Sequence, residues 1–451
     1  MNSERELDLA GIGVGPFNLS LAALLEPIPG IHARFFERKP NFDWHPGMML
    51  AGTRMQTSFL KDLVTPVDPS SRYSFLSYIV EQGRFYRFVN AEFARVPRLE
   101  FAAYLRWAAS RIAALRFASE AREVLCTDRG FELRFSSGEV VYSKHLAVGT
   151  GLRPNVPSWA RDHLGTRCSH SNDYQVRDLD VTDRSVAVIG GGQSGAEIFL
   201  QLLSGVRGTA KRVSWVSRRA GLEPLDETAF TNEYFTPDYV RHYHELPEER
   251  RRALAYAQKL TGDGVSPETL RDLSQALYSR DFLEHRRTPY RILTNREIRS
   301  MSGRHSHYVL GMRNFFNQTD EYLEADVVLL ATGYRYRLPS CLSPIAELLE
   351  LDADGLPRLN EDYTARWNPP FRGDAAQHRI YMLNAGRHSH GVPDSQLSLA
   401  AWRSAVIVNS LCGRKVYDTT PQPAPLEWVD EQGPMSRRSN SGEVELRAGR
   451  A

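Results

Sequence analysis

The stretch Ala187-Val-Ile-Gly-Gly-Gly-Gln-Ser-Gly-Ala-Glu197 organises the chain. Its apolar start predicts a buried parallel strand, and Gly190, Gly192 and Gly195 form a G-x-G-x-x-G turn into a helix. The first glycine permits the tight turn, the second lets the backbone approach a pyrophosphate, and the third lets the helix pack on the strand. Because a helix N-terminus directs free N–H groups at phosphates, the stretch predicts a dinucleotide-binding βαβ unit.

A second glycine-rich turn lies near the N-terminus. A predicted strand over 7–12 runs into Gly11-Ile-Gly13-Val-Gly15-Pro16-Phe17-Asn18, and a helix is expected over 19–25. Pro16 replaces the last glycine of the strict motif, which the first turn of a helix tolerates because the missing N–H costs little there. An ordinary βαβ unit with incidental glycines is the alternative.

The two turns differ at the end of the strand that follows each helix. The first strand, over 33–36, ends in Glu37, and the second, over 213–216, ends in Ser217, Arg218 and Arg219. An acid at this position, about 20 residues after the turn, suits the free hydroxyls of an adenosine ribose and repels a 2′-phosphate. A guanidinium binds a phosphate through its fork of donors. The first site is therefore predicted to take FAD or NAD, and the second NADPH, unless the arginines form only a solvated basic turn.

Two polar loops, over 42–48 and 55–63, follow the first βαβ unit and are predicted to lie over a cofactor. Trp44, beside His45, could stack on a flavin, and Gln56 could hydrogen-bond its edge. Lys61 is a cation among apolar neighbours, and a buried lysine needs a partner. The alternative places Trp44 in the core and pairs Lys61 with Asp62 or another acid.

Length and composition favour a globular protein of two or three domains. The chain has 451 residues, of which 42% are hydrophobic and 24% charged, with a net charge of +2. No strong field favours nucleic acid or an anionic membrane, and neither a signal peptide nor a transmembrane run is visible. The cysteines, at 126, 168, 341 and 412, form no C-x-x-C pair. This argues against a zinc site and a dithiol centre and fits the cytoplasm.

The remaining segments predict an α/β fold with two Rossmann-like domains and a small helical subdomain. The two dinucleotide units are interrupted by hairpin strands over 121–135, by strands over 140–148 and 325–331 that close on Gly-Thr or Thr-Gly turns, and by a polar helical insert. We expect an FAD domain over 1–160 and 380–420, an NADPH domain over 161–225 and 285–379, a substrate subdomain over 226–284 and a flexible tail over 421–451. His388 and His390 lack a third ligand at a known spacing, so no metal is expected and both should lie over a cofactor or at the surface.

Five motifs of this chain resemble those of a known family. In order along the chain they are the Gly11–Asn18 turn, Trp-His-Pro-Gly-Met, Gln-Thr-Ser-Phe-Leu-Lys-Asp-Leu, Gly-Gly-Gln-Ser-Gly-Ala-Glu and Leu-Ala-Thr-Gly-Tyr. The chain is similar over roughly residues 6–415 to the flavin-dependent N-hydroxylating monooxygenases of siderophore biosynthesis. The resemblance implies that NADPH reduces FAD, that O₂ gives a flavin C4a-hydroperoxide, and that a neutral terminal amine becomes a hydroxylamine. The protein's part is to position groups and exclude water. The family also suggests a homotetramer.

The resemblance carries roles onto individual residues. Gln56 corresponds to the glutamine at the flavin edge, and Lys61 and Asn232 correspond to the residues that hold an amino-acid substrate, with Ser398 nearby. These three residues, Gln56, Lys61 and Asn232, are the expected catalytic group. The expected cofactor residues are Gly11, Gly13, Gly15, Pro16, Phe17, Glu37, Trp44, His45, Gln56, Val124, Gly190, Gly192, Gln193, Ser194, Gly195, Ser217, Arg218, Asp394 and Leu397.

The substrate stays open between L-lysine and the diamines putrescine and cadaverine. Ornithine enzymes carry Thr-Asn-Tyr where this chain has Ala276-Leu277-Tyr278, which argues against ornithine. Two other classes fit part of the sequence. One is a flavin monooxygenase that oxidises carbonyls or thioethers. A disulfide reductase of the same flavoenzyme class is excluded, because it needs a cysteine pair that is missing. The other is a non-enzymatic nucleotide sensor, in which the loop from Gln56 to Lys61 would have no purpose.

Overall fold

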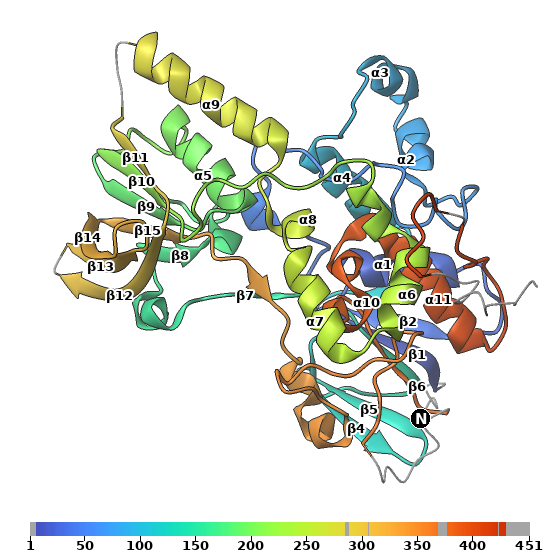
Figure 1. Ribbon diagram of the computed structural model, residues 1–451. Helices are drawn as coiled ribbons and strands as arrows, with labels where there is room; N and C mark the ends of the chain where they lie inside the picture. The colour runs from blue at the N-terminus through green and yellow to red at the C-terminus, as the bar shows by residue number, and fades with distance from the viewer. Residues whose placement is uncertain (1–5, 285–287, 305, 369–376, 423, 430–451) are drawn as a thin grey trace, which may run out of the picture.

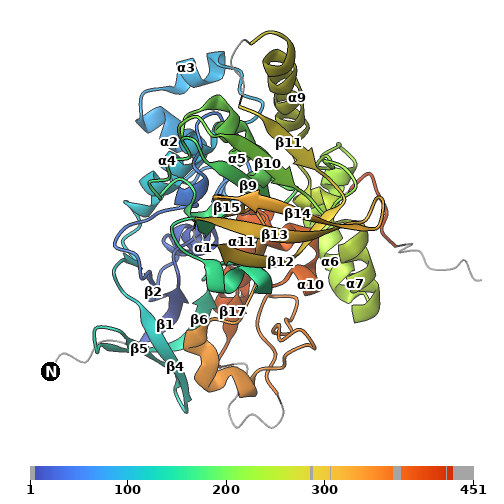
Figure 2. The same ribbon diagram turned by 90° about the vertical axis from the view of Figure 1, so that its left-hand side faces the viewer.

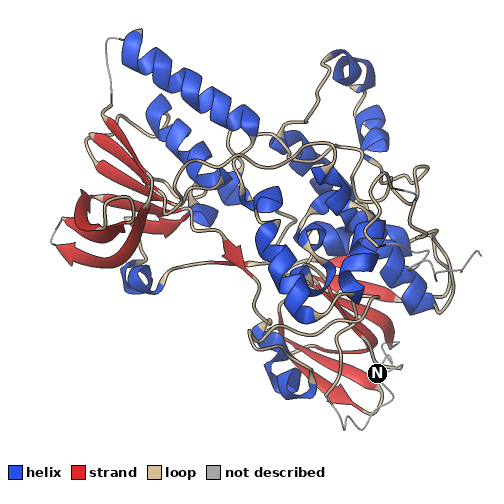
Figure 3. Cartoon of the chain, in the orientation of Figure 1, coloured by secondary structure: helices blue, strands red, loops and turns tan. Residues whose placement is uncertain are grey.

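Two sheets with parallel cores lie at opposite sides of the molecule, one at the left and one at the lower right of Figure 1. The computed structural model describes residues 6–284, 288–304, 306–368, 377–422 and 424–429. Helices occupy the space between and above the sheets (Figure 3). The predicted α/β architecture with two dinucleotide-binding units is confirmed.

The first sheet contains the N-terminal turn. Its strand order is β3-β2-β1-β6-β5-β4, and β17 pairs with β6. The strands β3, β2, β1, β6 and β17 run parallel, whereas β4, β5 and β6 form an antiparallel meander. The bounds are β1 (Leu7–Ile12), β2 (Ala33–Phe36), β3 (Leu115–Arg116), β4 (Ala121–Thr127), β5 (Gly130–Phe135), β6 (Val140–Val148) and β17 (Ile380–Met382).

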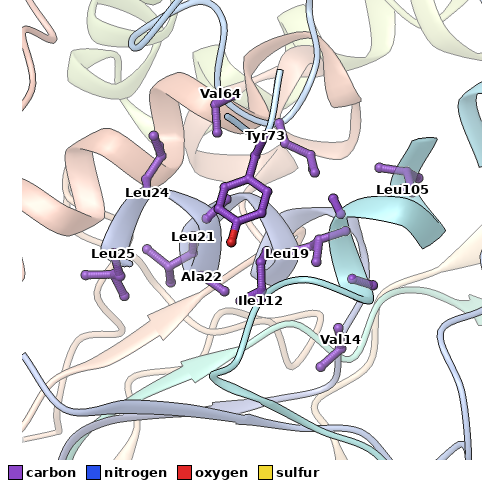
Figure 4. Close-up of a cluster of buried hydrophobic side chains, with 14 of the residues drawn as sticks. Val14, Leu19, Leu21, Ala22, Leu24, Leu25, Val64, Tyr73, Leu105 and Ile112 are labelled. Atoms are coloured by element: carbon purple, nitrogen blue, oxygen red, sulfur yellow. The ribbon is translucent and has the colours of Figure 1, made fainter. Parts of the chain in front are cut away.

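Helices cover one face of this sheet and bury the main apolar core (Figure 4). In α1 every residue except Phe17 is buried, which explains why its sequence is apolar on all sides. The helix begins at Pro16 with Gly15 as its N-cap, so the proline stands where its missing N–H is harmless. The helices on this side are α1 (Pro16–Leu25), α2 (Phe75–Glu81), α3 (Phe85–Asn90), α4 (Arg98–Ala109) and α11 (Ala400–Cys412).

The second sheet contains the turn quoted at the outset and is parallel throughout, in the order β11-β10-β9-β15-β8. Helices α5 and α9 cover one face, and the antiparallel sheet β12-β13-β14 covers the other, nearer the viewer in Figure 2. The bounds are β8 (Cys168–His170), β9 (Ser185–Ile189), α5 (Gln193–Ser204), β10 (Arg212–Val216), α9 (Pro267–Phe282), β11 (Tyr290–Leu293), β12 (Arg296–Arg304), β13 (His307–Asn314), β14 (Thr319–Ala325) and β15 (Val327–Leu330).

The chain passes between the two halves through the paired strands β7 (Arg153–Pro154) and β16 (Tyr334–Arg335). Side chains add to this connection. Asn155 Nδ2 donates to the Thr332 carbonyl (3.1 Å), and Arg98 at the start of α4 pairs with Glu197 of α5 (2.8 Å), with both charges largely buried. Short 3-10 segments surround the junction: η1 (Pro46–Met48), η2 (Ser158–His163), η3 (Ser171–Asp173), η4 (Thr231–Phe235), η5 (Ser340–Leu348), η6 (Val392–Ser395) and η7 (Leu397–Leu399).

The predicted helical insert divides between two places. Helices α6 (Pro237–Glu245) and α7 (Glu248–Ala257) lie against α10 (Arg387–His390), followed by α8 (Leu260–Asp263). Helix α9 instead packs on α5, because its apolar Leu273 joins the core of the second sheet. Its N-cap is Ser266, whose Oγ accepts the Thr269 N–H. In the part of the chain that the structure describes, no helix combines the length and apolar character needed to cross a membrane.

Two predicted boundaries differ from the structure. Residues 340–365, expected in the second domain, pack on the first sheet, where Leu342 and Ile345 share a core with Val124 and Phe131. The chain has already returned through β16 at this point, so its apolar side chains cover the meander. The expected flexible tail contains Trp428, which packs on aromatic rings near η4. Residues 430–451 lie outside the described residues.

A substitution at Gly195 tests how closely helix α5 packs on the strands of the second sheet. A Cβ at this position would lie 2.1 Å from the Gly190 carbonyl oxygen and 2.9 Å from Trp215 Nε1. We expect Gly195→Ala to lower the free energy of unfolding by about 1–3 kcal/mol, the usual cost of overpacking. Urea denaturation measures the free energy of unfolding. Gly221→Ala is the control, because nothing lies within 4 Å of a Cβ on Gly221. Equal stability of both variants would contradict this packing.

Candidate active site

A cavity of about 1150 Å³ opens where the carboxyl ends of the two sheets face each other. Open α/β sheets bind ligands at this edge. Residues of both halves line it, from the N-terminal turn through the loop over 54–61 to Gln193, Asn232 and the loop over 395–398. The volume exceeds the about 300–1,000 Å³ typical of a site for one small molecule.

The first cradle has the geometry expected of an adenosine site. Gly13 adopts φ +85°, and a Cβ on Gly15 would meet nothing closer than 4.0 Å, so the turn leaves room for a ligand. The carboxylate of Glu37 is fixed at the rim, where it accepts the Val14 N–H (2.8 Å) and the Lys39 N–H (3.0 Å). A carboxylate has further lone pairs for hydroxyl donors. The residues therefore fit a dinucleotide with an unphosphorylated ribose.

Among the described residues of the second cradle, Arg219 is engaged by the protein whereas Arg218 is exposed. Arg219 donates to the Asp263 carbonyl (3.0 Å) and pairs with Glu223 (3.2 Å), so it braces the loop. Ser217 is buried, and its hydroxyl accepts the Arg219 N–H (3.1 Å). Arg218 is exposed beside this turn. The sequence suggested both arginines as phosphate ligands, and only Arg218 is positioned for that role.

Trp44, Gln56 and Lys61 lie together on the wall of the cavity. Trp44 lines the cavity with part of its surface and packs against the first core with the rest, near Phe101, so stacking on a flavin stays a prediction. The Gln56 carbonyl accepts a hydrogen bond from Arg95, whose other nitrogen pairs with Glu227 (2.8 Å).

Lys61 does not pair with its neighbour Asp62. The Asp62 carboxylate is buried and accepts hydrogen bonds from the backbone N–H groups of Val64, Thr65 and Phe75. Burial lowers the pKa of the Lys61 ammonium, and the charge of Glu233 acts in the opposite direction. Among the described residues no carboxylate lies within 4.0 Å of it. Lys61 thus offers a poorly solvated cation to a ligand.

The loop after β17 supplies polar atoms without protein partners. Asn384 Oδ1 and Ser398 Oγ are buried, line the cavity and have no hydrogen-bond partner among the described residues. Such atoms are rare in folded proteins unless a ligand or water satisfies them. Asn232 stands opposite on η4, exposed at the lip of the cavity. These atoms fit a bound polar group.

Asp394 and Val124 do not line the cavity, contrary to expectation. Asp394 is buried, accepts the Gly386 N–H (2.6 Å) and pairs with the equally buried Arg403 (3.4 Å), so it braces the loop. The Val124 side chain lies in the core of the meander. The Phe35 ring occupies the space beside Gly11, since a Cβ on Gly11 would lie 2.1 Å from that ring.

The other expected residues fall into two groups. The first group lines the cavity: Gly13, Gly15, Pro16, Phe17, Glu37, Trp44, His45, Gln56, Lys61, Gln193, Ser194, Asn232, Leu397 and Ser398. The second group forms the second cradle outside it: Gly190, Gly192, Gly195, Ser217 and Arg218. The amide of Gln193 is occupied by the protein, since it accepts the Ser266 N–H (2.7 Å) and donates to Glu197 (2.9 Å).

Sequence reasoning gave no role to Arg95, Glu227 or Asn384. The partner of Arg95 is 132 positions away along the chain, beyond the reach of local sequence patterns. Ala276, Leu277 and Tyr278, on which the argument against ornithine rested, do not line the cavity, and Tyr278 is exposed on α9.

The two loop histidines lie elsewhere than expected. His390 is fully buried, stacks on Tyr363 (4.0 Å between ring centres) and lies beside His244, and burial lowers its pKa well below the usual value. His388 contacts the Pro357 carbonyl (3.1 Å). Within the described residues no group of three or more His, Cys, Asp or Glu could hold a metal ion.

The profile of the L-lysine 6-monooxygenase/L-ornithine 5-monooxygenase family matches residues 5–336. This chain belongs to that family. The resemblance inferred from the motifs is therefore confirmed. The L-lysine N6-monooxygenase of Escherichia coli is 37% identical over 427 residues, which cover 94% of this chain and 99% of the relative.

Two solved structures of similar proteins share the fold. The FAD-bound cadaverine monooxygenase DfoA of Erwinia amylovora has a TM-score of 0.87 and 29% identity, covering 95% of this chain and 99% of that one. The ornithine N-hydroxylase KtzI of Kutzneria sp. 744, solved with reduced FAD, NADP⁺ and L-ornithine, has a TM-score of 0.84 and 31% identity, covering 91% and 100%.

The lowered pKa of Lys61 predicts how the stability of the fold depends on pH. Since burial lowers its pKa below the usual 10.5, the unfolded chain binds the proton more strongly. The charged form therefore destabilises the fold at pH 7, and this cost disappears as the pH rises through the lowered pKa. We expect Lys61→Met to be as stable as the wild type or more stable at pH 7, with the difference shrinking in alkali.

Thermal unfolding between pH 6 and 10 measures this, with the exposed Lys211→Met as control. A Lys61→Met variant that is less stable at pH 7, and equally so at every pH, would contradict a desolvated ammonium.

Proposed function

We propose that this chain is an FAD- and NADPH-dependent monooxygenase that hydroxylates the terminal primary amine of a diamine, putrescine or cadaverine, or of L-lysine, for hydroxamate siderophore biosynthesis. One observation carries the proposal. A single cavity adjoins two dinucleotide cradles of opposite charge, with Glu37 at one and Arg218 at the other. The similar proteins act on lysine, cadaverine and ornithine.

The chain's residues would hold FAD along the first cradle. Gly13 and Gly15 give the pyrophosphate access to the backbone, and Glu37 accepts the ribose hydroxyls. When bound, FAD supplies the redox chemistry with NADPH and O₂. Trp44 and Gln56 orient its ring system from the cavity wall, and Arg95 fixes the Gln56 backbone. NADPH would lie across the N-terminus of α5, with Ser194 at its phosphates and Arg218 at the 2′-phosphate.

Lys61 and Asn232 would receive the amine substrate. A nucleophilic amine must be neutral, because only the neutral form has a free lone pair. Burial lowers the pKa of a cationic amine, as it does for Lys61, so enclosure of the substrate amine in the cavity would favour its neutral form. If the substrate is L-lysine, the Lys61 ammonium and the Asn232 amide bind its carboxylate, while the far amine reaches the flavin with Ser398 nearby.

We also propose a homo-oligomer, a tetramer by the family likeness, in the cytoplasm. Tyr278, Phe282 and Leu283 at the end of α9 are 61%, 71% and 65% exposed, and neighbouring apolar side chains of this size favour association. The cysteines at 126, 168, 341 and 412 are all free thiols, as reducing compartments favour.

A substrate panel tests the function and the role of Lys61 together. The FAD-loaded enzyme should oxidise NADPH and release hydroxylamine from lysine, cadaverine or putrescine, with ornithine as a fourth arm. Because a hydrogen bond to a charged group contributes about 1.5–3 kcal/mol, Lys61→Ala should raise the KM for lysine about 10- to 150-fold and leave NADPH oxidation intact. The KM for a diamine, which lacks the carboxylate, should change little.

Lys211→Ala serves as the matched control. Peroxide without hydroxylamine from every amine would reject the proposed function, and an unchanged KM for lysine in Lys61→Ala would reject the carboxylate contact.

Arg218 predicts the choice of nicotinamide cofactor. Arg218→Ala removes the one exposed guanidinium of the second cradle. On the same scale for a charge-assisted hydrogen bond, we expect the KM for NADPH to rise about 10- to 150-fold while the KM for NADH stays unchanged. Steady-state kinetics with both cofactors measures this. Arg219→Ala, which loosens the loop instead, should affect both cofactors alike, and a loss specific to NADPH there would contradict the assignment.

A further inference from the structure

The turn η4, which carries Asn232 and Glu233, is held by short-range hydrogen bonds within residues 226–236. It is a 3-10 segment of a few residues, and such segments are weak without outside packing. Asn232 is exposed at the cavity lip, and its side chain donates to the Glu227 carbonyl (3.4 Å) in the same loop. The position of this turn relative to the rest of the molecule therefore depends on what packs on Tyr234 and Phe235.

An aromatic cluster from three parts of the chain packs on this turn. Tyr234 of η4 contacts Tyr239 of α6 (5.2 Å between ring centres), and Trp428 contacts both, at 5.6 Å and 5.0 Å. Tyr239 is buried, and its hydroxyl donates to Gln258 (2.5 Å). The Tyr239 ring also lies close to Gly391, since a Cβ on Gly391 would be 3.1 Å from this ring. Gly391 comes shortly before the loop over 395–398, which lines the cavity.

Residues 417 and 419, which precede the segment that carries Trp428, are anchored to the first domain. After α11, the Tyr417 hydroxyl donates to the Leu24 carbonyl (2.7 Å), and the Thr419 carbonyl accepts from Trp402 Nε1 (3.2 Å). Pro421 and Pro425 have their backbone φ angles fixed by their rings. The C-terminal segment thus joins the FAD side of the molecule to the turn that faces the substrate.

We infer that Trp428 is a positioning residue for the amine site: through Tyr234 and Tyr239 it holds Asn232 and Glu233 in place opposite Lys61. This inference rests on the proposed function, because it concerns the same substrate. Glu233 acts electrostatically on Lys61, so displacement of η4 changes both the amide and the charge that the substrate meets. Trp428 does not line the cavity.

The test compares Trp428→Ala with Trp428→Phe, which keeps a ring, and with Val429→Ala, an exposed neighbour. Each FAD-loaded enzyme is assayed at saturating NADPH with the amine that the wild type turns over. Since aromatic pairs contribute modestly, we expect Trp428→Ala to raise the amine KM about 3- to 10-fold, to release more peroxide per NADPH and to leave the KM for NADPH unchanged. Trp428→Phe should recover most of the affinity.

A second readout does not depend on turnover. Amide hydrogen exchange of the peptide covering residues 228–236 should accelerate in Trp428→Ala and stay at the wild-type rate in Val429→Ala. Unchanged exchange would overturn the inference, and so would faster exchange with an unchanged amine KM. A rise in both the amine and NADPH KM values that Trp428→Phe fails to recover would also overturn it, since it indicates a general loss of structure. If no amine is hydroxylated by the wild type, the proposed function fails, whereas the exchange rates still report whether Trp428 holds the turn.

Discussion

The structure depends on one fold used twice with opposite charge at the same position. In each copy a parallel strand turns through glycines into a helix, and the next strand ends beside the turn. The first ends in Glu37, whose carboxylate is fixed by the Val14 and Lys39 N–H groups. The second ends in Ser217 and the exposed Arg218. In the proposed function, the carboxylate repels a 2′-phosphate and the guanidinium attracts one, so that a single architecture would distinguish two nucleotides.

The two copies act as one site because they are held face to face. The paired strands β7 and β16, the Arg98–Glu197 ion pair and the Arg95–Glu227 ion pair join the halves around the cavity. Each ion pair links a residue of the basic turn before α4 to an acid of the other half. Arg95 also donates to the Gln56 carbonyl, so this connection between the halves shapes the wall of the site as well.

Local patterns predicted the parts of the fold that depend on nearby residues. Strands β1, β6 and β9 and both glycine turns lie where periodicity and turn chemistry indicated. The errors came from contacts between distant segments. Arg219 could not be separated from Arg218 without knowing that Asp263 and Glu223 engage it, and Asp394 could not be assigned to the core without Arg403. The Pro-rich end near Trp428 has the composition of a loose tail, and only Tyr234 and Tyr239 show that it packs.

Competition by adenosine fragments tests the central claim most directly. In the FAD-loaded enzyme, inhibition of NADPH oxidation is compared for 2′,5′-ADP and 5′-ADP while the flavin absorbance is recorded. If opposite charges select the nucleotides, 2′,5′-ADP competes with NADPH at far lower concentration than 5′-ADP and releases no flavin. Equal inhibition by the two fragments, or release of FAD by the 2′-phosphorylated one, would contradict the assignment of Glu37 and Arg218.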